Sequence, residues 1–124
     1  MRVASLALVV LLAGCHRQDE RTARQLTNGG EPERGRAAIV AYGCGACHEI
    51  PGVSGARGLV GPPLNNIGER TYLAGQLPNS SDNMIRWIRD PQGVESGTAM
   101  PNLNVTQTDA RDIAAYLYTL RTLR

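Results

Sequence analysis

The run Cys44-Gly45-Ala46-Cys47-His48 carries the clearest chemistry in the sequence. Two cysteines separated by two residues and followed at once by a histidine form the C-x-x-C-H attachment signature of a c-type haem. The thiols of Cys44 and Cys47 would add to the two vinyl groups on one edge of the porphyrin. The imidazole of His48 would then lie under the ring, where it can ligate the iron. The spacing therefore predicts one covalently bound haem.

Two other uses of these cysteines fit the sequence less well. A structural zinc site needs two further Cys or His ligands at suitable spacing, and the rest of the chain offers only Cys15 and His16. A thioredoxin-like redox pair needs a β-α-β context, and no Val- or Ile-rich strands alternate with helices here. Zinc binding and dithiol chemistry remain as alternatives behind haem attachment.

The third cysteine, Cys15, follows an apolar stretch at the N-terminus. Residues 3–13 are almost entirely apolar, and as a helix they would span about 16 Å, which is well short of the ~30 Å hydrocarbon core of a bilayer. With Arg2 before it, this stretch is typical of an export signal. Its end, Leu12-Ala13-Gly14-Cys15, resembles a bacterial lipobox. We therefore expect residues 1–14 to be a lipoprotein signal peptide, the alternative being an ordinary signal peptide with an incidental cysteine.

Lipidation of Cys15 would place the protein outside the cytoplasm. A diacylglyceryl group supplies two acyl chains, which suffice for stable anchoring. We expect an exported protein, lipid-anchored to a bacterial membrane and facing the periplasm or the cell exterior. Residues 15–30 are polar with little to bury, and they are predicted to form the lipidated N-terminus and a flexible tether. Residues 31–124 are then long enough for one folded domain.

The composition agrees with a small domain built around a cofactor. The chain has no Phe, one Trp and four Tyr, and a domain of this size buries a limited core. A covalently held porphyrin would supply the large apolar mass that the side chains lack. The formal net charge is only +2, and no basic run is interleaved with aromatic residues, so we expect no nucleic-acid partner.

Three segments have the patterns of helices that could position the motif. Residues 31–42 begin with Glu-Pro-Glu, which suits a helix start, and they run into the C-x-x-C-H turn. Residues 81–90 contain Met84, Trp87 and Ile88 at helical spacing, and residues 106–123 read as an amphipathic helix that a Thr can cap. Gly- and Pro-rich loops lie between them, and no strand pattern appears. The sequence predicts an all-α domain of three to four helices.

In this order of parts, the chain from about Glu31 to its end resembles a class I, single-haem cytochrome c. A helix precedes C-x-x-C-H, Gly-Pro-Pro-Leu at residues 61–64 follows it, Met100-Pro101 lies in a late loop, and a helix with aromatic residues ends the domain. The segments 87–91 and 98–102 are especially similar to bacterial cytochrome c domains that feed terminal oxidases. The resemblance implies the cytochrome c fold around one haem c.

The resemblance also implies the ligands of the iron, with His48 as the proximal and Met100 as the distal one. Apart from Met1, the chain has one other methionine, Met84, which lies on the apolar side of a predicted helix and is expected to fill core space. Before Met100 the family usually has Pro-Gly-Thr, whereas this chain has Ser96-Gly97-Thr98. Met100 precedes a proline in a loop, where the backbone is stiff enough to hold a thioether.

Other residues receive supporting roles from the resemblance. The backbone carbonyl of Gly61 or Pro62 is expected to accept a hydrogen bond from the His48 imidazole, which would fix the orientation of the ring. Tyr116 is expected to pack where the last helix crosses the first, and Trp87 is also expected to serve packing. The sequence does not choose among three candidates for binding a haem propionate: Arg57, Arg70 and Tyr72.

Two axial side-chain ligands would leave substrate no access to the iron, so the implied activity is outer-sphere electron transfer. No catalytic dyad or triad is found, and we expect no enzyme activity. The leading interpretation is a membrane-anchored carrier of single electrons in a respiratory chain. Its donor would be a quinol-oxidising complex or a dehydrogenase, and its acceptor an oxidase or reductase. The alternatives are a fixed electron-entry subunit of such a complex and a haem protein whose iron Met100 leaves open.

Overall fold

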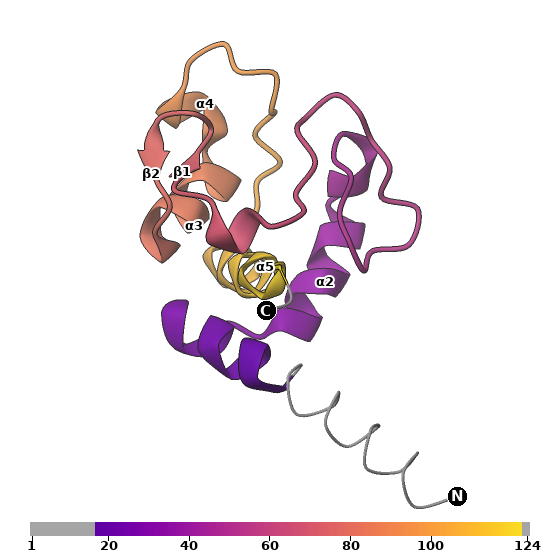
Figure 1. The fold of residues 1–124 in the computed structure, drawn as a ribbon. Coiled ribbons are helices and arrows are strands. Elements are labelled where there is room, and N and C mark those ends of the chain that lie inside the picture. Colours follow the sequence, from indigo (N-terminus) through magenta and orange to yellow (C-terminus); the bar gives the residue numbers. More distant parts are fainter. Residues whose placement is uncertain (1–16, 123–124) are drawn as a thin grey trace, which may run out of the picture.

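Helices dominate the computed structural model of the protein, which describes residues 17–122 (Figure 1). The all-α prediction is confirmed. A helix at residues 17–26 comes first. The other elements follow in the order α2 (Pro32–Ala41), the 3₁₀ turns η1 (Cys44–Ala46) and η2 (Ile67–Glu69), the strands β1 (Tyr72–Leu73) and β2 (Leu77–Pro78), α3 (Ser81–Arg89), α4 (Pro91–Val94) and α5 (Gln107–Thr119).

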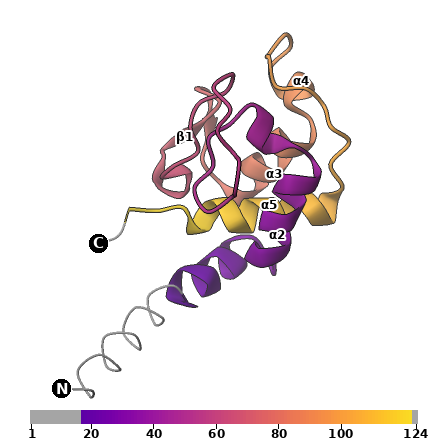
Figure 2. The same cartoon turned by 90° about the vertical axis from the view of Figure 1, so that its right-hand side faces the viewer.

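Helix α5 is the central element, and α2 crosses it (Figures 1 and 2). Of the threonines that could cap α5, the structure shows that Thr106 does so, because its side chain accepts a hydrogen bond from the backbone N–H of Asp109 at 3.1 Å. The two helices approach closely at Gly35, where an added Cβ would overlap the backbone carbonyl of Asp112. Glycine is therefore required at this crossing because any side chain would push the helices apart.

Polar contacts fix both ends of α2 against α5. Asp112 is only 3% exposed, and its carboxylate accepts hydrogen bonds from the backbone N–H of Glu31 and from Nε of Arg34, each at 2.8 Å. At the other end of α2, the hydroxyl of Tyr42 donates to the carboxylate of Asp109 at 2.7 Å. A buried carboxylate is tolerated when its oxygens are hydrogen-bonded in this way.

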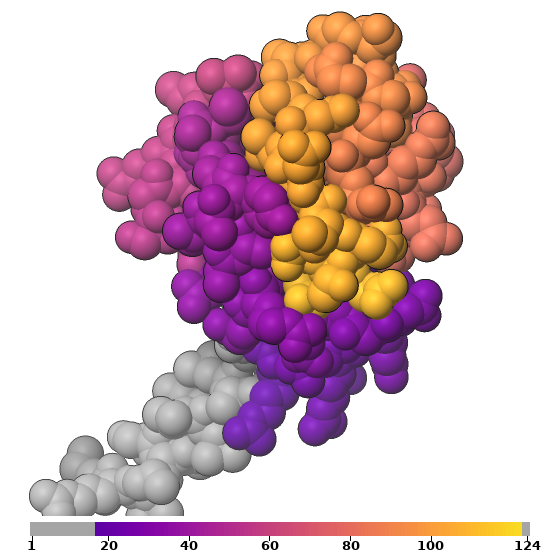
Figure 3. Space-filling model, turned by 180° about the vertical axis from the view of Figure 1, so that it is seen from behind, coloured from indigo at the N-terminus to yellow at the C-terminus, as the bar shows by residue number. Residues whose placement is uncertain are grey.

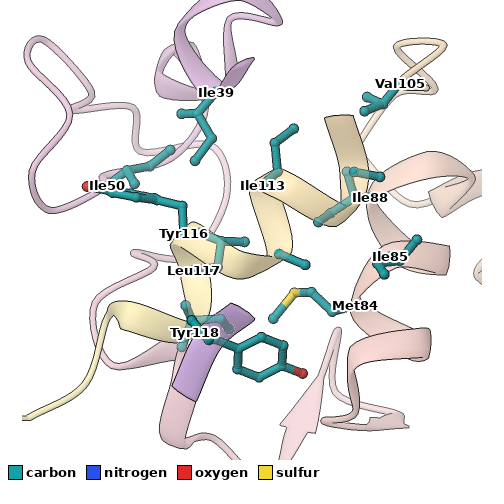
Figure 4. Close-up of a cluster of buried hydrophobic side chains, with 14 of the residues drawn as sticks. Ile39, Ile50, Met84, Ile85, Ile88, Val105, Ile113, Tyr116, Leu117 and Tyr118 are labelled. Atoms are coloured by element: carbon teal, nitrogen blue, oxygen red, sulfur yellow. The ribbon is translucent and has the colours of Figure 1, made fainter. Parts of the chain in front are cut away.

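Helix α3 covers another side of α5 and contributes much of the core (Figure 4). Ser80 caps it through a hydrogen bond from the backbone N–H of Asn83 to its hydroxyl at 3.3 Å. Met84 is 2% exposed and belongs to the core cluster, which confirms its predicted packing role. The helix predicted over residues 81–90 is confirmed and ends at Arg89, and Pro91 then starts the single turn of α4.

A short hairpin, which the sequence did not predict, joins η2 to α3. Strands β1 and β2 are antiparallel, with Tyr72 opposite Pro78 and Leu73 opposite Leu77. Asn79 ties this region to α5, because its side-chain amide donates to the carbonyls of Ile67 at 2.9 Å and Arg70 at 2.8 Å and accepts from the Tyr118 hydroxyl at 2.9 Å. Strands of two residues are too short to show an alternating pattern in a sequence.

The prediction of a flexible tether is wrong for residues 17–30. Residues 17–26 are helical, and Ala23 and Thr27 are 0% and 1% exposed. A Cβ on Gly30 would lie 2.6 Å from the carbonyl oxygen of Arg111 in α5. The segment thus buries small residues by close approach instead of burying large apolar ones, and it runs beneath α5 (Figure 3). Because the composition of this segment is polar, its buried face was not predicted from the sequence.

The predictions for the signal peptide (residues 1–14) and for Cys15 lie outside the described residues. Within residues 17–122, every helix is too short or too polar to span a bilayer.

Candidate haem site

The two cysteines of the motif lie on one tight turn after α2. We call residues 43–63 the attachment loop. It begins at Gly43 with φ 73°, and the backbone N–H groups of Cys47 and His48 both donate to the carbonyl of Cys44, at 3.2 and 3.1 Å. Both thiols are free and partly buried. The turn therefore presents two thiols and an imidazole from five consecutive residues, as covalent attachment of a haem requires.

The surroundings of the thiols do not support the alternative chemistries. Burial, with a smaller contribution from the neighbouring Cys47, raises the pKa of the Cys44 thiol, whereas redox-active dithiols have lowered pKa values. The strands of the described chain form only the antiparallel hairpin and no β-α-β unit. Among residues 17–122, no three His, Cys, Asp or Glu side chains lie together as a metal site would need.

The imidazole of His48 is held in one orientation. Its Nδ1 lies 2.8 Å from the backbone carbonyl oxygen of Pro62. A carbonyl can only accept, so Nδ1 carries the proton and Nε2 keeps its lone pair for a metal. The sequence left Gly61 and Pro62 as candidates for this carbonyl, and the structure selects Pro62.

Gly61 serves the same histidine in a different way. A Cβ at Gly61 would overlap the imidazole of His48, so the ring can lie against the backbone only because this residue has no side chain. The backbone N–H of Gly61 also donates to the carbonyl of Cys47 at 2.8 Å. The Gly61-Pro62 pair therefore gives the ring both its space and its hydrogen-bond partner.

The attachment loop is tied together by its own backbone. The N–H of Gly58 donates to the carbonyl of Gly45 at 3.1 Å, and the N–H of Leu64, just beyond the loop, donates to that of Glu49 at 2.8 Å. Three apolar residues of the loop are buried: Ile50, Val53 and Ala56. The loop that carries His48 is thus a small folded unit with buried side chains of its own.

A side chain of α5 fastens this loop to the helix core. The hydroxyl of Tyr116 donates to the carbonyl of Pro51 at 2.6 Å, and burial raises the pKa of this tyrosine. The packing expected of Tyr116 is confirmed, with the hydrogen bond as an added role. Trp87, in contrast, is only partly buried and lies outside the core cluster.

The expected distal ligand lies in a second loop. We call residues 95–105 the methionine loop; Met100 is partly buried there and Pro101 follows it. Both loops lie on the same side of α5 (Figures 1 and 2). The other described methionine, Met84, points into the core between α3 and α5 (Figure 4). Of these two thioethers, only that of Met100 lies outside the core.

The propionate candidates remain three. Nη2 of Arg70 donates to the carbonyl of Pro63, and to that of Asn65 at 3.0 Å, so it supports the segment that follows Pro62. The backbone of Arg57 pairs with Glu49 in an isolated bridge, and Tyr72 is exposed.

Taken together, two free thiols, an oriented imidazole with a free Nε2 and a thioether outside the core fit a covalently bound haem.

Comparison with known proteins gives consistent results. The family model described as cytochrome c matches residues 32–121. Cytochrome c oxidase subunit 2 of Alkalihalophilus pseudofirmus is 35% identical over 91 residues, which cover 73% of this chain and 26% of that protein. The same subunit of Bacillus sp. (strain PS3) is 28% identical over 88 residues, covering 68% and 25%. The chain thus spans about a quarter of the length of these relatives.

Proposed function

Because this chain belongs to the cytochrome c family and carries covalently attached haem c, we propose that it transfers single electrons in a respiratory chain with His48 and Met100 as axial ligands. The observation that carries this proposal is the hydrogen bond from Nδ1 of His48 to Pro62, which leaves Nε2 available beside Cys44 and Cys47, neither of which forms a disulfide. The haem supplies an iron that takes up and releases one electron.

The residues of the chain would set how that electron moves. Pro62 and Gly61 hold the His48 ring in place, so the proximal ligand need not reorient when the charge on the iron changes. The thioether of Met100 is a soft ligand that would favour ferrous iron and so raise the potential. With His48 and Met100 both bound to the iron, electron transfer would be outer-sphere, and we expect the chain to catalyse no reaction of its own.

We propose that the protein is exported and anchored through a lipid on Cys15, facing the periplasm or the cell exterior. Its acceptor would be a terminal oxidase or a reductase, and its donor a quinol-oxidising complex or a dehydrogenase. The oxidase side is supported by the names of its relatives, which are oxidase subunits. The anchor is supported by the lipobox-like sequence alone.

A second candidate is a fixed electron-entry subunit of an oxidase complex. Two observations favour it: the relatives are subunits, and residues 17–30 are folded onto α5 instead of forming a tether. Extraction of native membranes with a mild detergent separates the two candidates. A mobile carrier is expected to elute alone, whereas a fixed subunit co-purifies with oxidase activity.

The first test of the proposal is the visible spectrum of the purified ferrous protein before and after exposure to carbon monoxide. We expect sharp low-spin bands that carbon monoxide does not change, because His48 and Met100 fill both axial positions. A shifted spectrum in undamaged protein would contradict this coordination. It would favour an open iron and a role in ligand sensing or catalysis.

A further inference from the structure

The side chain of Gln92, in the single turn of α4, holds the backbone of the methionine loop. Its Nε2 donates to the carbonyl of Thr98 at 2.7 Å and to that of Met100 at 2.8 Å. Its Oε1 accepts from the backbone N–H of Gly97 at 3.3 Å. One primary amide thus satisfies three backbone groups within residues 97–100, including the carbonyl of the expected ligand itself.

Gln92 can act in this way because α4 is itself held in place. The carboxylate of Asp90 accepts from the backbone N–H of Gly93 at 3.0 Å and from Nδ2 of Asn102 at 3.1 Å. Oδ1 of Asn102 in turn accepts from the backbone N–H of Gln92 at 3.3 Å. The buried ring of Pro91 fixes the start of the turn. The amide of Gln92 therefore extends from a fixed base.

The methionine loop needs such support, because it has little of its own. It contains a backbone hydrogen bond from Thr98 to Glu95 at 3.2 Å, and Gly97 is in the left-handed conformation with φ 83°. Most residues before Val105 are exposed. A methionine side chain is long and flexible, so its sulfur is well placed only if its backbone is.

We propose that Gln92 is the positioning residue for the axial thioether: by holding the carbonyls of Thr98 and Met100, it keeps the sulfur of Met100 directed at the iron. This inference rests on the proposed function, which assigns Met100 as a ligand. Gln92 does not touch the iron and acts only through the loop.

Because of the composition of the chain, dissociation of the Met100 thioether from the iron would be detectable. All 13 basic residues are arginine, so no lysine amine is available as a replacement ligand. His48 is the only histidine among residues 17–122, and Met84 is buried in the core. When the thioether leaves, the described chain offers the iron no further imidazole, amine or exposed thioether, and the position opens to small molecules.

The test compares variants of the full-length haem protein. Gln92→Leu removes all three hydrogen bonds, and Gln92→Glu keeps the size and the acceptor but cannot donate to the two carbonyls. Gln107→Leu is the matched control, because Gln107 accepts a hydrogen bond from Arg89 at 2.8 Å and has no bond to the methionine loop. The measurements are carbon monoxide binding to ferrous protein, the ferric charge-transfer band of a sulfur ligand, the midpoint potential and thermal unfolding.

Both Gln92 variants are expected to increase the fraction of iron open to carbon monoxide by about tenfold to a hundredfold, as the loss of two or three hydrogen bonds implies. The sulfur band weakens and the potential falls, while Gln107→Leu behaves as the unmodified protein. A change in thermal stability without these changes at the iron would overturn the proposal. If Gln92→Leu does not accumulate, Gln92→Glu decides: unchanged carbon monoxide binding and potential would overturn it.

The same experiment separates failure of this inference from failure of the proposed function. If the unmodified protein already binds carbon monoxide, Met100 is not a ligand, and the proposed coordination and the role of Gln92 both fail. If the unmodified protein is closed and both Gln92 variants are also closed, the proposed function stands and only the positioning role fails.

Discussion

The attachment loop and the methionine loop lie on the same side of α5 but are held by different means. In the attachment loop, backbone groups bond to one another, and the apolar side chains of Ile50, Val53 and Ala56 are buried beneath them. The methionine loop depends largely on two polar side chains, those of Gln92 and Asn102. Near its end it buries Val105.

This difference implies unequal freedom for the two proposed ligands. The imidazole of His48 is held by backbone atoms of the attachment loop itself, so we expect it to keep its orientation as long as that loop is folded. Met100 can leave when a few partly buried hydrogen bonds break, since no buried side chain of residues 95–104 resists the motion. We therefore expect disturbances of the site to open the distal side first.

The largest effect is expected from a substitution in the attachment loop, which we infer to be the more rigid of the two loops. A Cβ at Gly58 would overlap the backbone of Ala46 and Cys47, so Gly58→Ala should cost on the order of 4 kcal/mol in the free energy of unfolding. Chemical denaturation of the haem protein measures it. Gly55→Ala is the control, because Gly55 has φ 76° and open space around it, and it should cost only about 1 kcal/mol. Equal costs would mean that the loop is not rigid at Gly58.

Substitution of the two methionines, one in the core and one in the methionine loop, separates an effect on stability from an effect on the iron. Met84→Ala should cost about 3 kcal/mol in stability, because it leaves a cavity in the core, and the iron should stay closed to carbon monoxide. Met100→Ala should leave the haem attached and the fold largely intact, but lower the potential and open the iron. Denaturation and carbon monoxide titration of both variants check this. If Met84→Ala opened the iron instead, the ligand assignment would be wrong.

Alkaline pH should weaken the fold chiefly at Tyr118, whose hydroxyl bonds to neither loop. Burial raises the pKa of Tyr118 to about 12, above the ordinary value of about 10. The unfolded chain therefore loses this proton first, and stability that is complete below about pH 10 should fall by up to about 2 kcal/mol as the pH rises toward 12.

Denaturation midpoints from pH 8 to 12 measure this slope. Tyr118→Phe should remove its largest part, and the remainder belongs to Tyr42 and Tyr116, whose pKa values are also raised. The hydroxyl of Tyr118 donates to Asn79 and bonds to neither loop. A slope that is the same in Tyr118→Phe would show that this residue is not its source.

The smallest effect is expected at the edge of the methionine loop. Asn102→Ala removes two exposed hydrogen bonds, to Gln92 and Asp90, and should cost about 1 kcal/mol or less. Hydrogen exchange of the backbone N–H of Gln92 should become faster, and thermal unfolding measures the loss of stability. A loss as large as that of Met84→Ala would mean that the loop contributes to the core after all.

The helices were predictable because their signals are local. A Thr or Ser next to an apolar periodicity marks the starts of α5 and α3, and Pro91 marks the end of α3. The predicted last helix extended to residue 123, whereas α5 ends at Thr119. Helix ends that lack a Gly or Pro give the sequence no comparable signal.

The candidate site was predictable only where its parts are adjacent in sequence. The C-x-x-C-H run and the Gly61-Pro62 pair identify themselves as motifs. Gln92 does not, because its partners at residues 97–100 come within reach only when the loop folds back over α4. The burial of residues 17–30 was also hidden, since Ala23, Thr27 and Gly30 pack by being small and not by being apolar.

The position of the first helix has a consequence for how the molecule would stand on a membrane. Residues 17–26 lie on the side of α5 opposite to both loops (Figures 1 and 2), and one residue separates them from Cys15. A lipid on Cys15 would therefore place this helix toward the bilayer. Two layers of helix would raise the two loops by roughly 20 Å. Electrons would then be exchanged at a fixed height above the membrane, and a redox partner would have to contact the protein at that height.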